Sequence, residues 1–295
     1  MELIGSFYLW LSVLTLFILI SLLFLKIYVS HLKLILTLAF ATLSYTYSII
    51  YWYLPQPQGA TTELEFTTMT YNVNRQSWDT EAVTEILRTY SADIFGLVEP
   101  FQEQAADLRD HVQDLYPHYY RSTGGGLSLF SRYPILTPKT DSLGTSDSSL
   151  LAMFDLKGKQ IRVVVTHPIV PISRENHRRR NALISALAKY AAQQQEPLII
   201  MGDFNTVSWS PYLREFEHLS GLRNATLGYG LHPTWCYGDP GNFFRPLEQF
   251  LRLLKIPIDH IFVSDHIIVD QVTTGPAGIS DHRPLITHLQ LLRTR

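Results

Sequence analysis

The chain of 295 residues contains one cysteine, Cys236, so it cannot form an internal disulfide. That thiol also lacks partners at the spacing of a cysteine-based metal site. Basic residues are not in excess: beyond residue 60 there are 22 Lys and Arg against 25 Asp and Glu, a net charge of −3. These totals do not indicate a strongly basic surface for nucleic acid, and a metal ion can supply local positive charge instead.

Charge is missing altogether from two long apolar runs near the N-terminus, residues 3–25 and 34–54. Each run is long enough to cross a hydrocarbon core of about 30 Å at about 1.5 Å per residue. A cleaved signal peptide is the alternative for the first run. That run is too long, however, Glu2 replaces the usual basic start, and a second apolar run follows closely. The sequence therefore predicts a hairpin of two transmembrane helices within residues 1–54.

The few charges around these runs predict an orientation. Lys26 and Lys33 lie between them, no Lys or Arg precedes the first run, and none follows the second until Arg75. Because cytoplasmic loops carry an excess of Lys and Arg, we expect the loop inside and both flanks outside. This predicts an integral membrane protein with an extracytoplasmic C-terminal domain; the reversed orientation, with a cytoplasmic domain, is the alternative.

The rest of the chain has the pattern of one large α/β domain. Residues 55–65, rich in proline, glycine and polar side chains, predict a linker, and residues 66–295 are long enough for one core. Short apolar strands are predicted at 66–73, 93–98, 127–131, 161–166, 198–201, 258–264 and 284–292, and helices at 79–90, at 174–193 and from Pro211 onward. This mixture is typical of an α/β sandwich.

Polar side chains gather where these apolar strands begin or end. A carboxylate and an amide one residue apart, Asp203 and Asn205, follow the buried strand 198–201. Other strand ends carry Asn72, Glu99, His167, Asp259 and the run Ser280-Asp281-His282. If these ends meet at one edge of the sandwich, they form a single site.

Six short motifs carry a family resemblance: TYN, VE, THP, GDFN, IDH and SDH, in this order. With them, residues 66–290 resemble the endonuclease/exonuclease/phosphatase superfamily. That group includes DNase I-like nucleases, abasic-site endonucleases, neutral sphingomyelinases and inositol-polyphosphate phosphatases. The resemblance implies a four-layer α/β sandwich, with two packed mixed sheets flanked by helices and an active site at the strand ends along one edge.

The resemblance also implies a divalent-metal site. Glu99 matches the metal-binding glutamate of the family, Asn72 a metal or phosphate contact, and Asp281 a metal ligand or a neighbour that orients one. Hard oxygen ligands of this kind suit Mg²⁺ or Mn²⁺. Phosphodiester cleavage needs such a metal to draw charge from the phosphate, together with a positioned water and help for the leaving oxygen.

Five further residues match catalytic positions of the family. Asp203 resembles the residue that orients the attacking water, and Asn205 can donate amide hydrogens to a phosphate oxygen; an ordinary Asx-turn is the alternative for this pair. His282 and Asp259 resemble a dyad in which the carboxylate raises the pKa of the imidazole, which then acts as a general base or as a stabilising cation. His167 resembles a second catalytic histidine that can protonate the leaving oxygen.

Four other features have weaker support. Asn74 stands where abasic-site enzymes of the superfamily often carry an acidic residue, so this motif lacks that second carboxylate, and Asn74 is interpreted as a turn residue. His260 should face away from Asp259 along its strand and be structural. Arginines 178–180 at a helix start are expected to be solvated, with phosphate contact as the alternative. Residues 233–236, PTWC, are expected to pack rather than to stack on substrate.

The sequence thus predicts a membrane-anchored, divalent-metal-dependent phosphodiesterase that hydrolyses nucleic-acid phosphodiesters. A lipid head-group phosphodiesterase of the sphingomyelinase type and a phosphomonoesterase are alternatives within the same fold. A non-catalytic scaffold is a remote alternative, because it should have lost one of the residues named above. No protein partner is evident.

Overall fold

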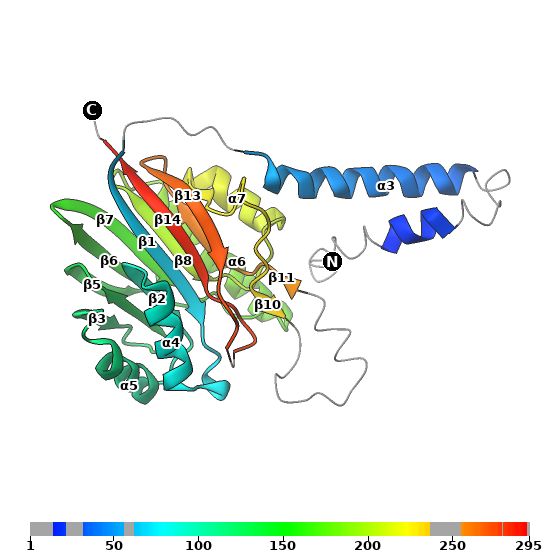
Figure 1. The fold of residues 1–295 in the computed structure, drawn as a ribbon. Coiled ribbons are helices and arrows are strands. Elements are labelled where there is room, and N and C mark those ends of the chain that lie inside the picture. The colour runs from blue at the N-terminus through cyan, green and yellow to red at the C-terminus, as the bar shows by residue number, and fades with distance from the viewer. Residues whose placement is uncertain (1–13, 22–31, 56–61, 237–254, 279, 294–295) are drawn as a thin grey trace.

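The computed structural model describes residues 14–21, 32–55, 62–236, 255–278 and 280–293, and two six-stranded mixed sheets dominate this part of the chain (Figure 1). In spatial order, the first sheet consists of β13 (Ile267–Thr274), β14 (Leu285–Leu292), β1 (Thr62–Asn72), β2 (Ile94–Val98), β4 (Leu127–Ser131) and β3 (His118–Arg121). The second consists of β5 (Ile135–Asp141), β6 (Ser149–Leu156), β7 (Lys159–Thr166), β8 (Leu198–Asp203), β12 (Asp259–Val263) and β9 (Arg223–Asn224).

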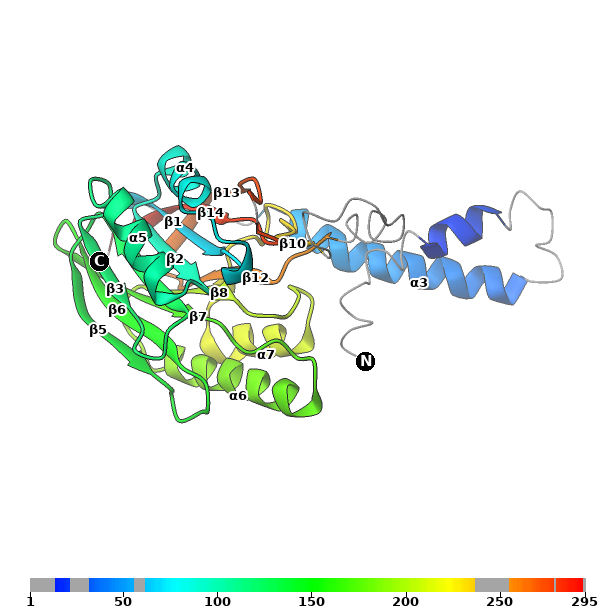
Figure 2. The ribbon, with the colours of Figure 1, turned by 90° about the horizontal axis from the view of Figure 1, so that it is seen from below.

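The sheets pack face to face and carry helices on their outer faces. Buried side chains of both sheets form the central core, among them Phe66, Ile94, Val163 and Ile199. Helices α4 (Thr80–Tyr90) and α5 (Gln102–Val112) cover the first sheet, and α6 (Arg174–Ala191) and α7 (Pro211–Ser220) cover the second (Figure 2). The order helix, sheet, sheet, helix confirms the predicted α/β sandwich.

Local sequence explains where the helices begin. The Asp79 side chain accepts hydrogen bonds from the backbone N–H groups of Glu81 and Ala82, which caps α4. Ser210 caps α7, and Pro211 occupies its first position, where a missing N–H costs nothing. α7 therefore starts at the predicted residue, and α4 starts at Thr80, one residue after the predicted start.

Other boundaries differ from the sequence prediction. Strand β1 begins at Thr62, four residues before the predicted strand, because Thr62–Thr70 pair with β14 although their side chains are largely polar at the start. The elements α5, β3, β5, β6, β9 and β13 were not predicted. A two-stranded sheet of β10 (Trp235–Cys236) and β11 (Lys255–Ile256) was not predicted either, because the Gly- and Pro-containing residues 227–257 were expected to be irregular.

Strand direction decides which chain ends share an edge. β1 and β2 run parallel, with Asn72 opposite Val98, and β7 and β8 run parallel, with Thr166 opposite Gly202. The residues that follow each parallel pair therefore emerge side by side. β12 runs antiparallel to β8 and places Asp259 directly opposite Asp203.

The N-terminal prediction is corrected by the structure: no helix in the described part of the chain is both long and apolar enough to cross a bilayer. The first apolar run is described only over residues 14–21, and the rest of it lies outside the described residues. The second contributes α3 (Leu32–Ile50), 19 residues that include the hydroxyl-bearing stretch SYTYS. A span takes about 20 predominantly apolar residues. The transmembrane hairpin, and with it the integral membrane protein with an extracytoplasmic domain, is therefore wrong.

A short 3-10 helix, η1 (Tyr51–Tyr53), joins the end of α3 to the sandwich. Trp52 is buried, and its carbonyl oxygen accepts hydrogen bonds from the backbone N–H groups of Gly228 and Gly230, each 2.9 Å long. Gly230 has a φ of +104°, and a Cβ there would lie 2.7 Å from the Tyr53 ring. This segment therefore packs closely on the domain, although α3 itself projects away from it (Figure 1).

Candidate active site

Asn72, the last residue of β1, links the two sheets at the shared edge. Its side chain is buried, and Nδ2 donates to Glu99 Oε1 at 3.1 Å and to Asp203 Oδ2 at 3.0 Å. Glu99 follows β2 in the first sheet, and Asp203 ends β8 in the second. One amide therefore holds together carboxylates from both sheets.

Three side chains converge on a single oxygen, Asp203 Oδ2. Besides Asn72, His167 Nε2 lies 3.6 Å from it and His282 Nε2 lies 3.7 Å from it. His167 Nε2 is also 3.5 Å from Glu99 Oε1. The structure thus brings predicted residues from five strand ends into one cluster, and the roles assigned to them remain predictions.

His282 and Asp259 form a buried pair in which Nδ1 lies 2.8 Å from Oδ2. Burial by itself lowers the pKa of His282, but the negative charges of Asp259 and Asp203 and the hydrogen bond outweigh it and raise the pKa to about 10. The imidazole is therefore charged at neutral pH. Burial and repulsion from Asp259 raise the pKa of Asp203, and the two histidines only partly oppose this.

The turn after β8 fits both interpretations of Asp203 and Asn205, an Asx-turn and a pair that contacts water and phosphate. The Asp203 carboxylate accepts the Asn205 backbone N–H at 2.8 Å, which is an Asx-turn. Asn205 has a left-handed φ of +50°, and its side-chain Nδ2 donates to the carbonyl of Pro168 at 3.0 Å. This bond ties the turn to the loop after His167 and leaves one amide hydrogen of Asn205 for another acceptor. Glu99 also adopts a left-handed φ, +70°, and such strain is concentrated at functional sites.

Asp281 is oriented by two residues that sequence analysis assigned to a turn and to packing. Asn74 Nδ2 donates to Asp281 Oδ1, and Trp235 Nε1 donates to Asp281 Oδ2, both at 2.9 Å. The signal for Asn74 was its place two residues after Asn72. The signal for Trp235 was the resemblance of PTWC to a Thr-Trp stretch of the superfamily, which was interpreted as packing.

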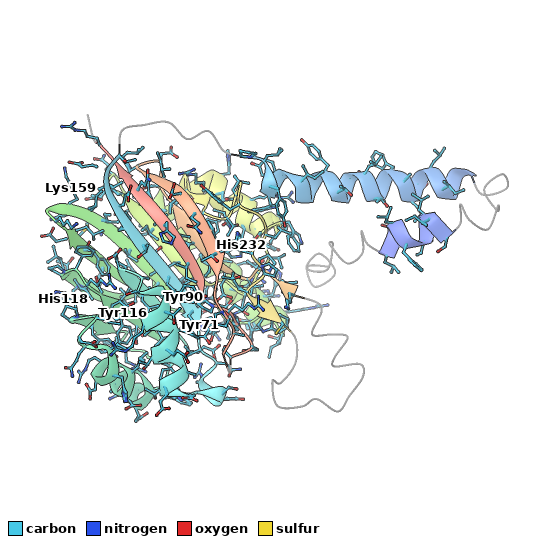
Figure 3. All side chains as sticks on the ribbon, in the orientation of Figure 1. Tyr71, Tyr90, Tyr116, His118, Lys159 and His232 are labelled. Atoms are coloured by element: carbon cyan, nitrogen blue, oxygen red, sulfur yellow. The ribbon has the colours of Figure 1, made fainter. Side chains whose placement is uncertain are left out.

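The loop that carries His282 is fastened to β1. Tyr71, labelled in Figure 3, donates its hydroxyl to the carbonyl of Ala277 at 2.6 Å. Ser280 Oγ donates to the carbonyl of Asn72 at 2.8 Å and accepts the His282 backbone N–H at 3.0 Å. Burial raises the pKa of Tyr71 strongly, so its hydroxyl stays a donor. These bonds position the histidine through its backbone.

Two buried side chains support the turn that contains Asn205 by contacting its backbone carbonyl groups. Arg180 Nη1 donates to the carbonyl oxygen of Asn205 and His260 Nε2 lies against that of Thr206, both at 2.9 Å. His260 faces away from the cluster, as predicted, and burial lowers its pKa to about 4, so its imidazole is neutral. Asn224 Nδ2 lies 3.1 Å from His260 Nδ1 and leaves Nε2 as the donor.

Arg180 was not predicted as a supporting residue. It is only 1% exposed, whereas the Arg178 side chain is 76% exposed and Arg179 pairs with Asp147. The expectation of a solvated face thus holds for Arg178 alone. Helical spacing was the available signal, because Arg180 precedes the buried Leu183 and Ile184 by three and four residues and shares their face.

The net charge of the cluster indicates whether a divalent cation would be favourable in this site. Four carboxylates, those of Glu99, Asp203, Asp259 and Asp281, stand against the His282 imidazolium and the Arg75 guanidinium, which lies 3.6 Å from Glu99. Asp259 Oδ1 is buried and has no hydrogen-bond partner among the described residues. Such an excess of negative charge repels a phosphate ester unless a cation offsets it, and the oxygen donors suit a hard divalent ion.

Glu99 is the best-placed metal ligand, because its carboxylate is buried in part but 23% exposed. Asp203, Asp259 and His282 also have one ligand atom each within 4.8 Å of the others. Asn72 Oδ1 accepts the Asn74 backbone N–H at 3.0 Å, and its predicted role as a metal ligand is not tested.

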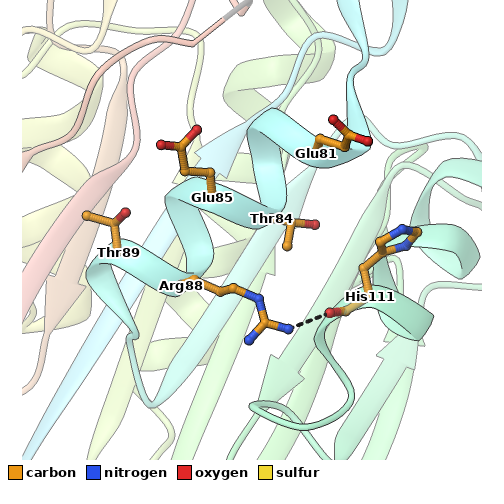
Figure 4. Close-up of a pocket in the computed structure, with 6 residues that line it drawn as sticks. All are labelled: Glu81, Thr84, Glu85, Arg88, Thr89 and His111. Atoms are coloured by element: carbon orange, nitrogen blue, oxygen red, sulfur yellow. Dashed lines mark hydrogen bonds between the residues drawn. The ribbon is translucent and has the colours of Figure 1, made fainter.

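A separate hollow of about 490 Å³ lies on the outer helical layer, between α4 and α5 (Figure 4). Arg88 crosses it and donates to the carbonyl of His111 at 2.9 Å. None of the predicted site residues lines this hollow.

Two packed mixed sheets with carboxylates, amides and imidazoles converging at one edge define an α/β-sandwich hydrolase. Residues 69–282 match the model of the Endonuclease/Exonuclease/phosphatase family, and the chain belongs to that family. It is accordingly an enzyme of a group that hydrolyses phosphate esters and that typically depends on a divalent metal.

Solved structures share the fold. A Danio rerio TDP2 complexed with a single-strand DNA product is 15% identical and has a TM-score of 0.64, covering 77% of this chain and 99% of that one. A Bacteroides vulgatus endonuclease/exonuclease/phosphatase is 21% identical with a TM-score of 0.59, covering 78% and 100%. A Bacteroides thetaiotaomicron mannosyl-6-phosphatase is 18% identical with a TM-score of 0.56, covering 76% and 99%. No curated protein matches the chain.

Proposed function

We propose that the protein is a divalent-metal-dependent phosphodiesterase that hydrolyses nucleic-acid phosphodiesters. The observation that carries this proposal is the convergence on Asp203 Oδ2, which has Asn72 Nδ2 at 3.0 Å, His167 Nε2 at 3.6 Å and His282 Nε2 at 3.7 Å. A carboxylate between two imidazoles is suited to hold a water while donors contact a phosphate on either side.

A divalent cation, Mg²⁺ or Mn²⁺, would be held by Glu99 and Asp281. When bound, it withdraws charge from the phosphate and offsets the excess of carboxylates. Asn74 and Trp235 orient Asp281 for this purpose, and Asn72 orients Glu99.

The remaining residues have distinct tasks in the proposed reaction. Asp203, whose pKa is raised by burial, accepts a proton from the attacking water. His282 stays charged through Asp259 and donates Nε2–H to a non-bridging phosphate oxygen, where negative charge grows. His167 supplies a proton to the leaving oxygen, and Asn205 offers its free amide hydrogen to the phosphate.

A separate observation supports nucleic acid as the substrate. The structurally similar TDP2 is described in complex with a single-strand DNA product. The similar mannosyl-6-phosphatase makes a phosphomonoester the alternative that must be tested beside it. Lipid head groups lose their main argument, since it was the predicted membrane anchor.

The test is hydrolysis by the purified full-length chain of a single-stranded oligonucleotide, bis(p-nitrophenyl) phosphate, p-nitrophenyl phosphate and sphingomyelin. Each is assayed with Mg²⁺ or Mn²⁺ and again with EDTA. We expect turnover of the two nucleic-acid-like diesters, its loss in EDTA, and a fall in kcat of at least about 10³-fold for Asp203→Asn or His282→Ala.

Asp270→Asn, an exposed carboxylate on β13, is the matched control and should keep full activity. Turnover of p-nitrophenyl phosphate or sphingomyelin in preference to the oligonucleotide would replace the proposed substrate. Absence of chelator-sensitive turnover on every substrate would contradict the proposed function itself.

A further inference from the structure

An arginine and a phenylalanine stack on each other at the rim of the site. The centre of the Arg75 guanidinium lies 5.4 Å from the centroid of the Phe101 ring. The Arg75 side chain is 42% exposed, and Phe101 keeps 47% of its surface exposed despite this contact. The ring of Phe101 and the guanidinium of Arg75 are therefore both accessible to a ligand at this edge of the site.

The stacked pair is built into the fold rather than left on a free loop. Arg75 lies in the 3-10 helix η2 (Arg75–Ser77), and Phe101 precedes α5. Gln104, in the first turn of α5, accepts the Phe101 backbone N–H at 2.7 Å and donates to the carbonyl of Arg75 at 3.0 Å. One side chain thus holds both segments, so the two flat groups are positioned before any ligand arrives.

The pair adjoins the proposed reaction centre. Arg75 Nε lies 3.6 Å from Glu99 Oε2, the other oxygen of the carboxylate that Asn72 contacts. Phe101 is two residues beyond Glu99, with Pro100 between them. A phosphate bound through a cation at Glu99 would therefore lie on the side of the site that Arg75 and Phe101 border.

We propose that Arg75 and Phe101 form the subsite for a nucleobase attached to the phosphate under attack. This inference rests on the proposed function and names its substrate: a nucleotide unit rather than a phosphate with an arbitrary substituent. Aromatic rings and guanidinium planes both stack on bases, and such stacking tolerates any base. Arg75 also attracts the anionic backbone.

The same pair disfavours a choline head group. A quaternary ammonium binds over aromatic faces, as Arg75 already does at Phe101. A choline at this position would lie beside the like charge of Arg75, whereas a neutral base has no such penalty. The charge of the subsite thus selects a base over a phosphocholine.

The experiment compares p-nitrophenyl phosphodiesters whose second substituent is either a nucleoside or a methyl group. The full-length chain hydrolyses thymidine 5′- and 3′-(p-nitrophenyl phosphate) and methyl p-nitrophenyl phosphate with Mg²⁺. We expect Phe101→Ala to lower kcat/KM for at least one thymidine ester about 10-fold more than for the methyl ester. Phe101→Trp should keep the preference for the thymidine ester. Phe40→Ala, an exposed phenylalanine on α3, is the control and should change neither.

A binding measurement keeps the subsite testable if no diester is hydrolysed. Fluorescence anisotropy compares a dT hexamer with an abasic hexamer on Asp203→Asn and on Asp203→Asn/Phe101→Ala. Weaker binding of the dT hexamer alone, in the double variant, supports the subsite even if turnover fails and the proposed function falls. Equal losses for the two hexamers, or equal losses for thymidine and methyl esters, overturn the nucleobase subsite.

Discussion

At the scale of single residues, the turn that carries Asn205 depends on two buried side chains outside the cluster of site residues. Arg180 and His260 bind the carbonyl oxygens of the consecutive residues Asn205 and Thr206, each at 2.9 Å. Asn205 has a left-handed φ that a free chain rarely adopts. Two buried donors on adjacent carbonyls explain how the turn is kept in that conformation.

Arg180→Met should therefore lower kcat on a phosphodiester by about 10- to 100-fold, because a small misplacement of Asn205 misaligns the phosphate. Stability should also fall by about 1–3 kcal/mol, since a carbonyl loses its donor. Steady-state kinetics and urea unfolding measure the two effects. Arg178→Met, exposed on the same helix, is the control, and equal kinetics in both variants would contradict the positioning role.

Glu217 on α7 gives the stability of the protein a pH dependence. Its carboxylate accepts the Asn224 backbone N–H at 2.8 Å, and burial, only partly offset by this bond, raises its pKa from 4.5 to about 7. Between these values the folded state binds more protons than the unfolded state, so stability falls as pH rises and levels off above about pH 7.

We expect wild type to lose about 2 kcal/mol from this group between pH 4.5 and 7.5, a value reduced for partial exposure. Glu217→Gln should remove that part of the pH dependence, while Glu215→Gln, exposed on the same helix, should retain it. Urea unfolding across this pH range is the measurement. Parallel curves for wild type and Glu217→Gln would show that the group does not titrate as inferred.

At the scale of elements, the close approach of β7 and β8 sets the distance between His167 and Asp203. Gly202 has a φ of +144°, and a Cβ there would lie 1.9 Å from the carbonyl oxygen of Thr166. These two residues are paired and each immediately precedes a site residue. Only glycine permits this approach.

Gly202→Ala should therefore destabilise the protein by more than about 4 kcal/mol or prevent folding. The new Cβ would clash with the backbone of Thr166, which cannot move aside as a flexible side chain can. Gly124→Ala, where an added Cβ meets nothing within 4 Å and φ is not positive, should cost less than about 1 kcal/mol. Thermal unfolding distinguishes them, and similar Tm values for the two variants would refute the argument.

Elements with strong periodicity or clear caps were predictable, and those held by distant pairing were not. The caps at Asp79 and Ser210 act within four residues, so their helices started at the predicted residue or one residue later. By contrast, residues 62–65 of β1 are mostly exposed and are strand only because β14 pairs with them more than 200 residues later. Propensity does not report such pairing.

At the scale of the whole molecule, the segment after α3 is part of the sandwich surface. Trp52 is buried against the domain, and its carbonyl accepts the N–H groups of Gly228 and Gly230. The helix of residues 14–21 contacts α3 through a 3.1 Å hydrogen bond between Thr42 and Thr15. The attachment of α3 to the domain thus depends on η1.

Trp52→Ala should loosen this attachment without unfolding the sandwich, whose main core does not include Trp52. Amide hydrogen exchange at Gly228 and Gly230 should accelerate at least about 10-fold, because their acceptor is no longer held in place. Tyr51→Ala, half-exposed in the same turn, should leave both amides protected. Unchanged protection in Trp52→Ala would mean that the loop is held by other contacts.

By itself, the sequence determined the sandwich fold and the family, because alternating strands, helix caps and six motifs in order are local properties of the chain. It also identified the residues at the strand ends. Only the tertiary structure decided that Asp203 Oδ2 is where they meet, across a hydrogen bond between residues 131 apart. The tertiary structure also showed that Arg180 points inward, because the buried carbonyl of Asn205 needs a donor. It corrected the membrane prediction as well, because the length of an apolar run in the sequence does not determine the length of the helix that it forms.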